Sequence, residues 1–216
     1  TELCEQQGIQ LIHIFEDEWL YKQDIVKSRL KNILGVTETK IYARKCQIKE
    51  VSPKDSKQFL DDNHLQGSVK STKNIGLYYN NELVSIMTFG KRPMINKHDQ
   101  ELIRFCNKLN TTVIGGANKL LQYFIKIYKP KEIVSYADRR WSLGNLYQQL
   151  NFNLVKNTIP NFYYIINKKR VNRLNYQKHK LIKEGHDKNK TANQIMLDID
   201  IKKIYDCGTK KYLITL

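Results

Sequence analysis

Apolar and polar positions between residues 41 and 167 fall into short strand-like and longer helix-like segments. Apolar residues at alternate positions predict strands, whereas spacings of three and four predict helices. Ser52 before Pro53 marks a helix start, and Asn80-Asn81 between two apolar runs predicts an antiparallel hairpin. We expect, in chain order, a strand (41–51), a helix (53–66), a hairpin (76–79 with 83–89) and a polar loop containing Pro93 (91–100). A strand (101–106), a helix (112–128), a strand (133–137), a helix (143–150) and two closing strands (152–155 and 162–166) follow. This order predicts an α+β domain, with a mixed, mostly antiparallel sheet flanked by helices.

The flanking segments differ from this centre. Residues 8–15 form an apolar run that predicts a buried strand, and Glu16-Asp17-Glu18 begins a helix that ends at Gly35. The C-terminal part is strongly basic, with a short helix expected at 191–197 and a last small hairpin at 204–213. We therefore expect an N-terminal strand and helix, a central domain and a basic C-terminal extension, at residues 1–38, 41–167 and 168–216.

Composition adds a strong charge imbalance. The 216 residues include 37 Lys and Arg against 21 Asp and Glu, which gives a formal net charge of +16. Such an excess repels itself in a compact chain, so it favours a polyanionic partner, above all double-stranded DNA. The Lys, Asn and Ile bias of an AT-rich genome is the alternative explanation. We expect nucleic-acid contacts from basic residues at Arg139, Arg140, Lys168, Lys169, Arg170, Arg173, Lys178 and Lys180.

Cysteine spacing and apolar run lengths argue against other classes. Cys4, Cys46, Cys106 and Cys207 are scattered, and no histidine stands at zinc-ligand spacing, so we expect no metal site. No apolar run is long enough to span a bilayer, and the chain shows no signal peptide. We expect a cytoplasmic protein, located in the host cytoplasm if a phage encodes it.

One glycine motif indicates phosphate binding. Thr112-x-x-Gly115-x-Ala117 lies between a strand and a helix, where free backbone N–H groups attract phosphate. A tight turn without a ligand is the alternative. Asn145-Leu-Tyr147-Gln-Gln-Leu150-Asn-Phe152 follows one strand and one helix later. Together with the element order over residues 41–167, these segments resemble the GNAT acyltransferase family, with Thr112 in place of the usual Gln or Arg.

The GNAT resemblance implies a cofactor and a proton donor. Tyr147 would protonate the departing thiolate, since a phenol can donate a proton to a sulfur anion without a metal. An aromatic core residue on a helix is the alternative for Tyr147. Acetyl-CoA or another acyl-CoA would place its diphosphate on the glycine loop, at Thr112, Gly115, Gly116, Ala117 and Asn118.

Further segments narrow this resemblance. Residues 83–90, 101–107 and 133–138, with Gly144-x-x-Tyr147, resemble phage Mom-type DNA-modification proteins. The resemblance implies substrate or acid–base roles for Tyr136 and Asp138 at the end of a strand. An ion pair with Arg139 or Arg140, or a helix N-cap, is the alternative for Asp138. Trp141 and Arg140 would stack on a base flipped out of the duplex.

The opening residues carry a second resemblance. Cys4-x-x-x-Gly8-Ile-x-Leu-Ile-His-Ile-Phe-Glu-Asp-Glu-Trp19 resembles the last strand and helix of Vsr-like nuclease domains in phage mobile endonucleases. Only the tail of such a domain is present, so we expect no cleavage, and we interpret Glu16-Asp17-Glu18 as favourable charge at a helix start. The sequence thus leaves three hypotheses: acyl-CoA-dependent modification of a nucleic-acid amine, a catalytically silent DNA-binding C-terminal domain of a Vsr-like homing endonuclease, and acetylation of a protein or small amine.

Overall fold

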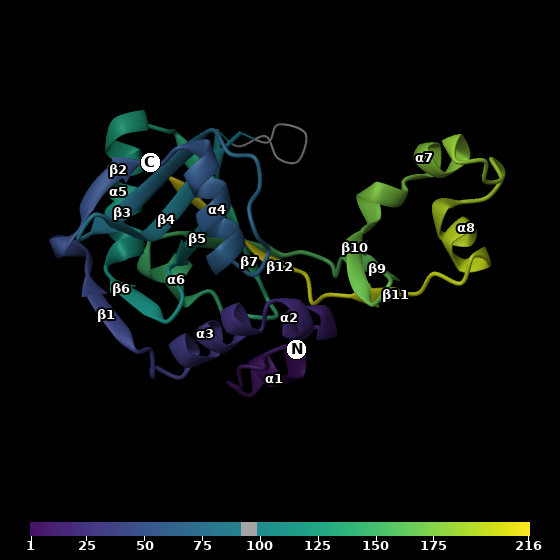
Figure 1. The fold of residues 1–216 in the computed structure, drawn as a ribbon, viewed down its shortest axis with the longest axis horizontal. Coiled ribbons are helices and arrows are strands. Elements are labelled where there is room, and N and C mark those ends of the chain that lie inside the picture. The colour runs from purple at the N-terminus through teal and green to yellow at the C-terminus, as the bar shows by residue number, and fades with distance from the viewer. Residues whose placement is uncertain (92–98) are drawn as a thin grey trace.

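The computed structural model describes residues 1–91 and 99–216, and its centre is a seven-stranded sheet in the order β2-β3-β4-β5-β7-β12-β8 (Figure 1). Neighbouring strands pair antiparallel except β5 and β7, which are parallel. The expected α+β fold class is therefore confirmed, while the polar loop containing Pro93 lies outside the described residues. The strands are β1 (Thr39–Tyr42), β2 (Gln47–Glu50), β3 (Lys73–Tyr79), β4 (Glu82–Gly90), β5 (Gln100–Asn107), β6 (Thr111–Ile114), β7 (Glu132–Asp138), β8 (Asn153–Asn157), β9 (Phe162–Ile166), β10 (Lys169–Asn172), β11 (Lys203–Tyr205) and β12 (Thr209–Thr215).

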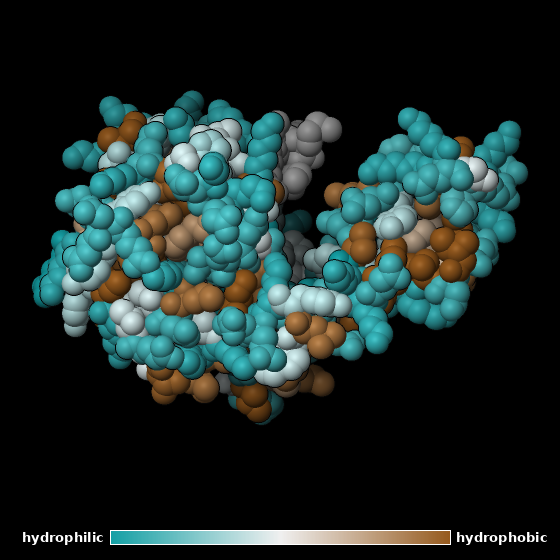
Figure 2. Space-filling model, in the orientation of Figure 1, coloured by the Kyte–Doolittle hydropathy of each residue, from teal (hydrophilic) through white to brown (hydrophobic). Residues whose placement is uncertain are grey.

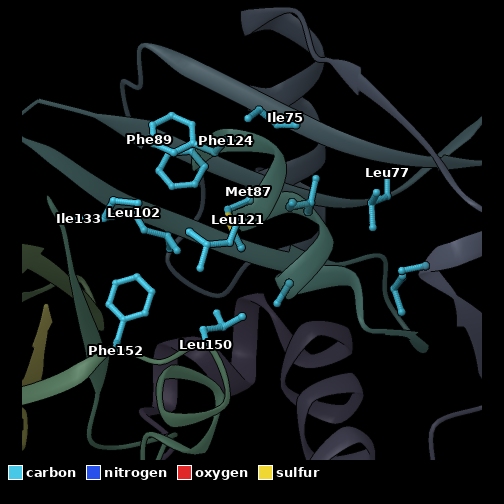
Figure 3. Packing of buried hydrophobic residues seen from close by; sticks show 14 of the residues in the cluster. Ile75, Leu77, Met87, Phe89, Leu102, Leu121, Phe124, Ile133, Leu150 and Phe152 are labelled. Atoms are coloured by element: carbon cyan, nitrogen blue, oxygen red, sulfur yellow. The ribbon is translucent and has the colours of Figure 1, made fainter. Parts of the chain in front are cut away.

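Helices cover both faces of this sheet. Ile86 and Met87 are neighbours on β4, so their side chains point to opposite faces. Ile86 packs with Phe59 of α4, whereas Met87 belongs to the main core cluster under α5. In that cluster the rings of Phe89 and Phe124 stack with centroids 3.6 Å apart (Figure 3). The α-helices are α1 (Glu2–Gln6), α2 (Glu16–Tyr21), α3 (Gln23–Ile33), α4 (Pro53–Asn63), α5 (Gly116–Tyr128), α6 (Asn145–Gln149), α7 (Lys178–Lys183) and α8 (Ala192–Asp198), with 3-10 turns η1 (Ala43–Lys45) and η2 (Arg173–Tyr176).

The parallel pair at the middle of the sheet is short. β5 and β7 pair only from Gln100↔Ile133 to Leu102↔Ser135, although β5 continues to Asn107 and β7 to Asp138. Past these pairs, within the described residues, the two strands share no further ladder. Their carboxyl ends therefore diverge and leave an opening in the sheet, which is where open sheets bind ligands.

The last strand of the chain enters the main sheet. β12 lies between β7 and β8 and pairs with both. The buried side chains of Tyr212 and Ile214 join the main core from this strand. The closing pair expected from 152–155 with 162–166, and the hairpin expected at 204–213, are therefore wrong. Strand pairing crosses the boundary expected at residue 167, because the apolar face of β12 completes the core of the central domain.

Residues 162–205 form a C-terminal lobe of their own. β9 pairs with both β10 and β11 in a three-stranded sheet, and α7 and α8 pack beside it. The lobe has a separate apolar core and stands away from the seven-stranded sheet (Figure 1). Hydrophilic residues cover much of its visible face (Figure 2). Its buried residues are Tyr164, Leu181, Ile195 and Met196.

The N-terminal segment differs from its prediction. Residues 9–15, all of them described, form no strand, and the helix expected after them is divided into α2 and α3 at Lys22. The segment's backbone contact with the central domain is the hydrogen bond from His13 N to Arg140 O at 3.3 Å. The apolar run instead contributes single side chains, with Ile12 packing on the cluster of Ile25 and Trp141. The strand prediction is therefore wrong, because these side chains fill gaps without a sheet edge to pair with.

A buried ion cluster fixes this segment to the rest of the molecule. The guanidinium of Arg140 contacts both carboxylate oxygens of Glu18 at 3.0 Å and Asp138 Oδ2 at 2.8 Å. Arg170 reaches the same cluster from β10, with bonds of 2.7 Å to Asp17 and 2.8 Å to Glu18. Arg140 and Glu18 are each 3% exposed. The cluster therefore joins α2, the end of β7 and the C-terminal lobe.

Removal of one carboxylate from this cluster should be costly. We predict that Glu18→Gln lowers the free energy of unfolding by about 3–5 kcal/mol, because two buried guanidinium groups lose their shared counter-charge. Glu16→Gln removes an exposed charge from the same turn and should change stability by less than about 0.5 kcal/mol. Urea unfolding followed by circular dichroism measures both. Equal effects of the two substitutions would contradict a structural role for the cluster.

Candidate active site

The opening between β5 and β7 contains a cavity of about 580 Å³, the β5–β7 pocket. β5 and β7 form two of its walls, and α3, the end of α4 and the start of α6 complete it. Tyr136, Asp138 and Tyr147, the three residues expected to act in catalysis, all line this cavity. Other charged and aromatic lining residues include Arg29, His64, Glu101, Arg104, Lys108 and Trp141.

Tyr147 lies at the point where the two strands separate. Its ring stacks on Tyr212 with centroids 4.5 Å apart, and its hydroxyl lies 3.0 Å from Ser135 Oγ. Ser135 in turn donates to the carbonyl oxygen of Leu102, the last paired residue of β5. Gly144 makes this approach possible, because its φ is +100° and a Cβ there would collide with the Tyr212 hydroxyl. Tyr147 therefore packs against the core and borders the pocket at once.

Burial sets the protonation of this phenol. Burial is the largest cause that raises the pKa of Tyr147, and the charge of Glu101 adds to it. The Ser135 hydrogen bond and Arg104 act in the opposite direction without reversing the shift. Because the pKa of a free tyrosine is already about 10, Tyr147 stays protonated at neutral pH. The side chain can therefore serve as a proton donor but not as a base.

Asp138 faces the pocket but is already engaged. Its Oδ2 pairs with Arg140 Nη2 at 2.8 Å, and its Oδ1 accepts from the Arg140 backbone N–H at 3.0 Å. The ion-pair alternative raised by the sequence is thus the arrangement found. Asp138 orients the chain that leaves β7, whereas Tyr136 lies two residues earlier on the same strand and also borders the pocket.

The structure corrects two of the basic residues expected to bind nucleic acid. Arg139 is 6% exposed and contacts Glu5 at 3.1 Å, the carbonyl of Cys207 at 3.2 Å and Glu2 at 3.5 Å. Arg140 is enclosed in the ion cluster. Neither guanidinium is available to phosphate, because both are buried and both form ion pairs with carboxylates of the N-terminal segment. Trp141 is 3% exposed and covered by Arg29, so stacking on a flipped base by Trp141 or Arg140 is also wrong.

The remaining basic residues divide into engaged and exposed groups. Arg170 pairs with Asp17 and Glu18, which leaves little of its charge for a partner. Lys180 donates to the carbonyl of Leu174 at 2.8 Å, and Arg173 lies over the ring of Phe162. Side chains exposed on the C-terminal lobe or at its edge are Lys168, Lys169, Arg173, Lys178, Lys183, Lys188 and Lys190.

The glycine loop forms the start of α5, as expected. Gly115 adopts φ +75° and no side chain caps the helix, so no side-chain cap engages the N–H groups of its first turn. Thr112 is used differently from the prediction, because its hydroxyl accepts from Asn32 Nδ2 at 2.8 Å. Thr111 lines the β5–β7 pocket, but none of the loop residues Thr112 to Asn118 does. The glycine loop and Tyr147 therefore lie in separate places.

The sequence did not single out several residues of the pocket. His64, at the end of α4, has its pKa held well below 6.5 by burial first, and then by Arg104, Arg29 and Lys22. Its Nδ1 accepts from the Gln66 backbone N–H at 3.2 Å, so the neutral ring carries its proton on Nε2. Glu101 is 6% exposed at the start of β5. A charged residue inside an apolar strand was the available signal, and it marks Glu101 and Arg104 of β5.

The described residues contain neither a cluster of metal-ligating side chains nor a helix able to cross a membrane. Within the described ranges, no group of three or more His, Cys, Asp and Glu residues is placed to hold a metal ion. None of the helices in this part of the chain combines the length and apolar character needed to cross a membrane.

Comparison with known proteins places this arrangement in a family. No curated protein matches the chain. A GNAT family acetyltransferase from Elizabethkingia anophelis, solved with acetyl-CoA bound, is 13% identical over 80% of this chain and 99% of its own, with a TM-score of 0.44. A Bacillus subtilis acetyltransferase in complex with CoA is 13% identical over 80% and 99%, with a TM-score of 0.45. Ard1 from Thermoplasma volcanium is 9% identical over 80% and 98%, with a TM-score of 0.47.

The match to a family model shows to which family this chain belongs. Residues 45–213 match the model of the Mom protein family. This span confirms the Mom-type resemblance of the central segments and also includes the C-terminal lobe and β12. Residues 1–44 lie outside it, so the Vsr-like resemblance of the opening segment stays a prediction. Because the match covers most of the 216 residues, the chain belongs to the Mom protein family.

Proposed function

We propose that this protein is an acyl-CoA-dependent N-acyltransferase whose acceptor is an amine of nucleic acid. The observation that carries the proposal is the position of Tyr147, a protonated phenol at the opening between β5 and β7. A proton donor at this point can protonate a leaving sulfur, which a thioester needs when its acyl group moves to an amine. The family match adds a DNA-modification context to this chemistry.

The start of α5 fits the diphosphate of an acyl-CoA. Backbone N–H groups of Gly116, Ala117 and Asn118 open the helix, and its dipole favours negative charge there. Gly116 fits tightly, because an added Cβ would meet Val113 at 3.0 Å. Lys119 adds positive charge beside the loop, where its ammonium also donates to the carbonyls of Ala43 and Cys46. A bound acyl-CoA supplies an activated acyl thioester at the far end of a long molecule.

The chain's own residues then act at the acyl end. Ser135 holds the Tyr147 hydroxyl 3.0 Å away and fixes it at the end of the paired part of β5 and β7. Stacking on Tyr212 prevents the ring from leaving this position. His64 lines the same cavity as a neutral ring, so it can donate a hydrogen bond without adding charge. Enclosure by α3 and α4 limits the access of water to the acyl group.

Loss of one hydroxyl tests the proposed acid. We predict that Tyr147→Phe lowers kcat for acyl transfer by about 10²–10⁴-fold and leaves acetyl-CoA affinity unchanged, because the ring still stacks on Tyr212. Incubation with DNA and acetyl-CoA, followed by mass spectrometry of the nucleosides, measures the product. Tyr205→Phe, at an exposed tyrosine of the C-terminal lobe, is the control. Full activity of Tyr147→Phe would show that the phenol is only a core residue.

Charge on the C-terminal lobe supports the nucleic-acid acceptor. The whole chain has a net charge of +16, and exposed lysines occur along α7 and the loop after it. Such side chains contact phosphates and release counterions, so affinity falls as salt rises. The lobe reaches the domain through Arg170 and the ion cluster, which keeps this basic surface connected to the end of β7.

Neutralising part of this surface should change the salt dependence of binding. We predict that Lys178→Gln with Lys183→Gln and Lys188→Gln weakens DNA binding, with the slope of log affinity against log salt reduced by about 1 for each lysine that contacts phosphate. Three exposed lysines of the main domain, exchanged as Lys54→Gln, Lys70→Gln and Lys126→Gln, form the control with the same change in charge. Fluorescence anisotropy over a range of salt concentrations measures both. Equal slopes for the two triple variants would remove the lobe from the DNA interface.

A silent DNA-binding domain is the second candidate function. The observation that favours it is that Asp17 and Glu18 of the N-terminal segment form ion pairs with Arg140 and Arg170. These carboxylates therefore attach the segment to the domain. In that case the protein binds DNA but not acyl-CoA. Acetylation of a protein or a small amine is a third possibility, which the nucleoside assay distinguishes because DNA would remain unmodified.

A further inference from the structure

Arg29 of α3 differs from the other enclosed arginines. Arg139, Arg140 and Arg170 each contact carboxylates, whereas Arg29 forms no ion pair with any residue of the described part of the chain. Its Nε is a buried atom without a hydrogen-bond partner. Its guanidinium lies over the ring of Trp141, 4.9 Å from the centroid, and lines the β5–β7 pocket. A cation is therefore held in the pocket with an incomplete set of partners.

Other atoms of the same pocket share this property. Among the described residues, six buried side-chain atoms lack a hydrogen-bond partner, and three of them belong to residues that line this pocket. Besides Arg29 Nε these are Trp141 Nε1, a second donor, and Asn107 Oδ1, an acceptor. Buried polar groups are normally satisfied, so a concentration of such atoms at one cavity calls for an explanation. A polar ligand bound in the cavity supplies the missing partners.

The charges around the cavity indicate the sign of that ligand. Asp138 is the carboxylate that most strongly offsets the burial of Arg29, and it is itself neutralised by Arg140. Arg104 also lines the cavity and is positively charged, whereas Glu101 is the opposing carboxylate on β5. Burial lowers the pKa of Arg29, because a charged guanidinium is less stable where few acceptors replace its water shell. An anion beside Arg29 removes this cost.

We propose that Arg29 binds a phosphate group of the acceptor nucleotide inside the β5–β7 pocket, so that α3 completes the acceptor site. The planar guanidinium presents paired donors that match phosphate oxygens, which makes arginine suited to this contact. α3 lies outside the segment matched by the family model. The identification of the acceptor rests on the proposed function. The phosphates of an acyl-CoA are the other source of the same chemistry, and the experiment separates the two.

The test compares two substitutions on one helix. Arg29→Gln removes the enclosed charge, whereas Lys27→Gln removes an exposed charge two residues earlier. The probes are the four deoxynucleoside 5′-monophosphates, the matching nucleosides without phosphate, and acetyl-CoA, each titrated by calorimetry. We expect Arg29→Gln to weaken nucleotide binding about tenfold or more, with nucleosides and acetyl-CoA unaffected. Lys27→Gln should leave every affinity unchanged.

Stability separates a binding role from a packing role. We expect Arg29→Gln to melt at or above the temperature of the wild type, because a partly buried cation without a counter-charge is removed. Arg29→Lys keeps the charge without the planar fork and should show intermediate nucleotide affinity. These measurements need no acyl transfer, so they remain informative if the protein proves to be a silent domain.

Three results would overturn the inference. Unchanged nucleotide affinity in a folded Arg29→Gln protein would show that the guanidinium does not contact phosphate. A large drop in melting temperature together with unchanged affinities would make Arg29 a packing partner of Trp141. Loss of acetyl-CoA affinity alone would transfer the anion site from the acceptor to the cofactor. Absence of acetyl-CoA binding in the wild type, by contrast, would contradict only the proposed transferase activity.

Discussion

The fold depends on one buried ionic interaction, the contact of Arg140 with Glu18 and Asp138. Enclosed charges are costly unless each has its partner, so the three segments that supply this cluster must assemble together. Glu18 brings the N-terminal segment, Arg140 and Asp138 the end of β7, and Arg170 the C-terminal lobe. α3 follows directly after α2, so the same cluster also sets the position of the helix that closes the β5–β7 pocket. The N-terminal segment thereby becomes part of the candidate active site.

Local signals made much of the central domain predictable. The hairpin at Asn80-Asn81, the helix that follows Gly115 and the strand that ends at Asp138 all depend on neighbours in sequence, and all are confirmed. Pairing over long distances was not predictable. β12 and β9 have similar apolar patterns, and only the tertiary core decides that Tyr212 belongs under the main sheet whereas Tyr164 belongs to the lobe. Periodicity records which face of a strand is buried but not against which partner.

The candidate site, too, was predictable from local sequence only in part. Tyr136 and Asp138 were expected at a strand end and Tyr147 on the helix that follows, and the structure brings all three to one cavity. Arg139 and Arg140 were assigned to nucleic acid because a charged pair after a strand gives no information about the carboxylates that fold onto it. Arg29 and His64 were missed because they reach the pocket only through helix packing. The glycine loop lies outside the pocket, so an acyl-CoA bound as proposed would have to connect two separate places, the start of α5 and the region of Tyr147.

The central claim, that an acyl-CoA binds at the start of α5, is tested most directly by calorimetric titration of acetyl-CoA into the wild type and Asn118→Asp. Asn118 is an exposed residue in the first turn of α5, where a carboxylate is favourable for the helix and unfavourable for a bound diphosphate. The account predicts saturable micromolar binding to the wild type and strongly weakened binding to the folded variant. No binding at millimolar acetyl-CoA, in a folded wild-type sample that still shifts DNA, would contradict it and leave a DNA-binding domain without transferase activity.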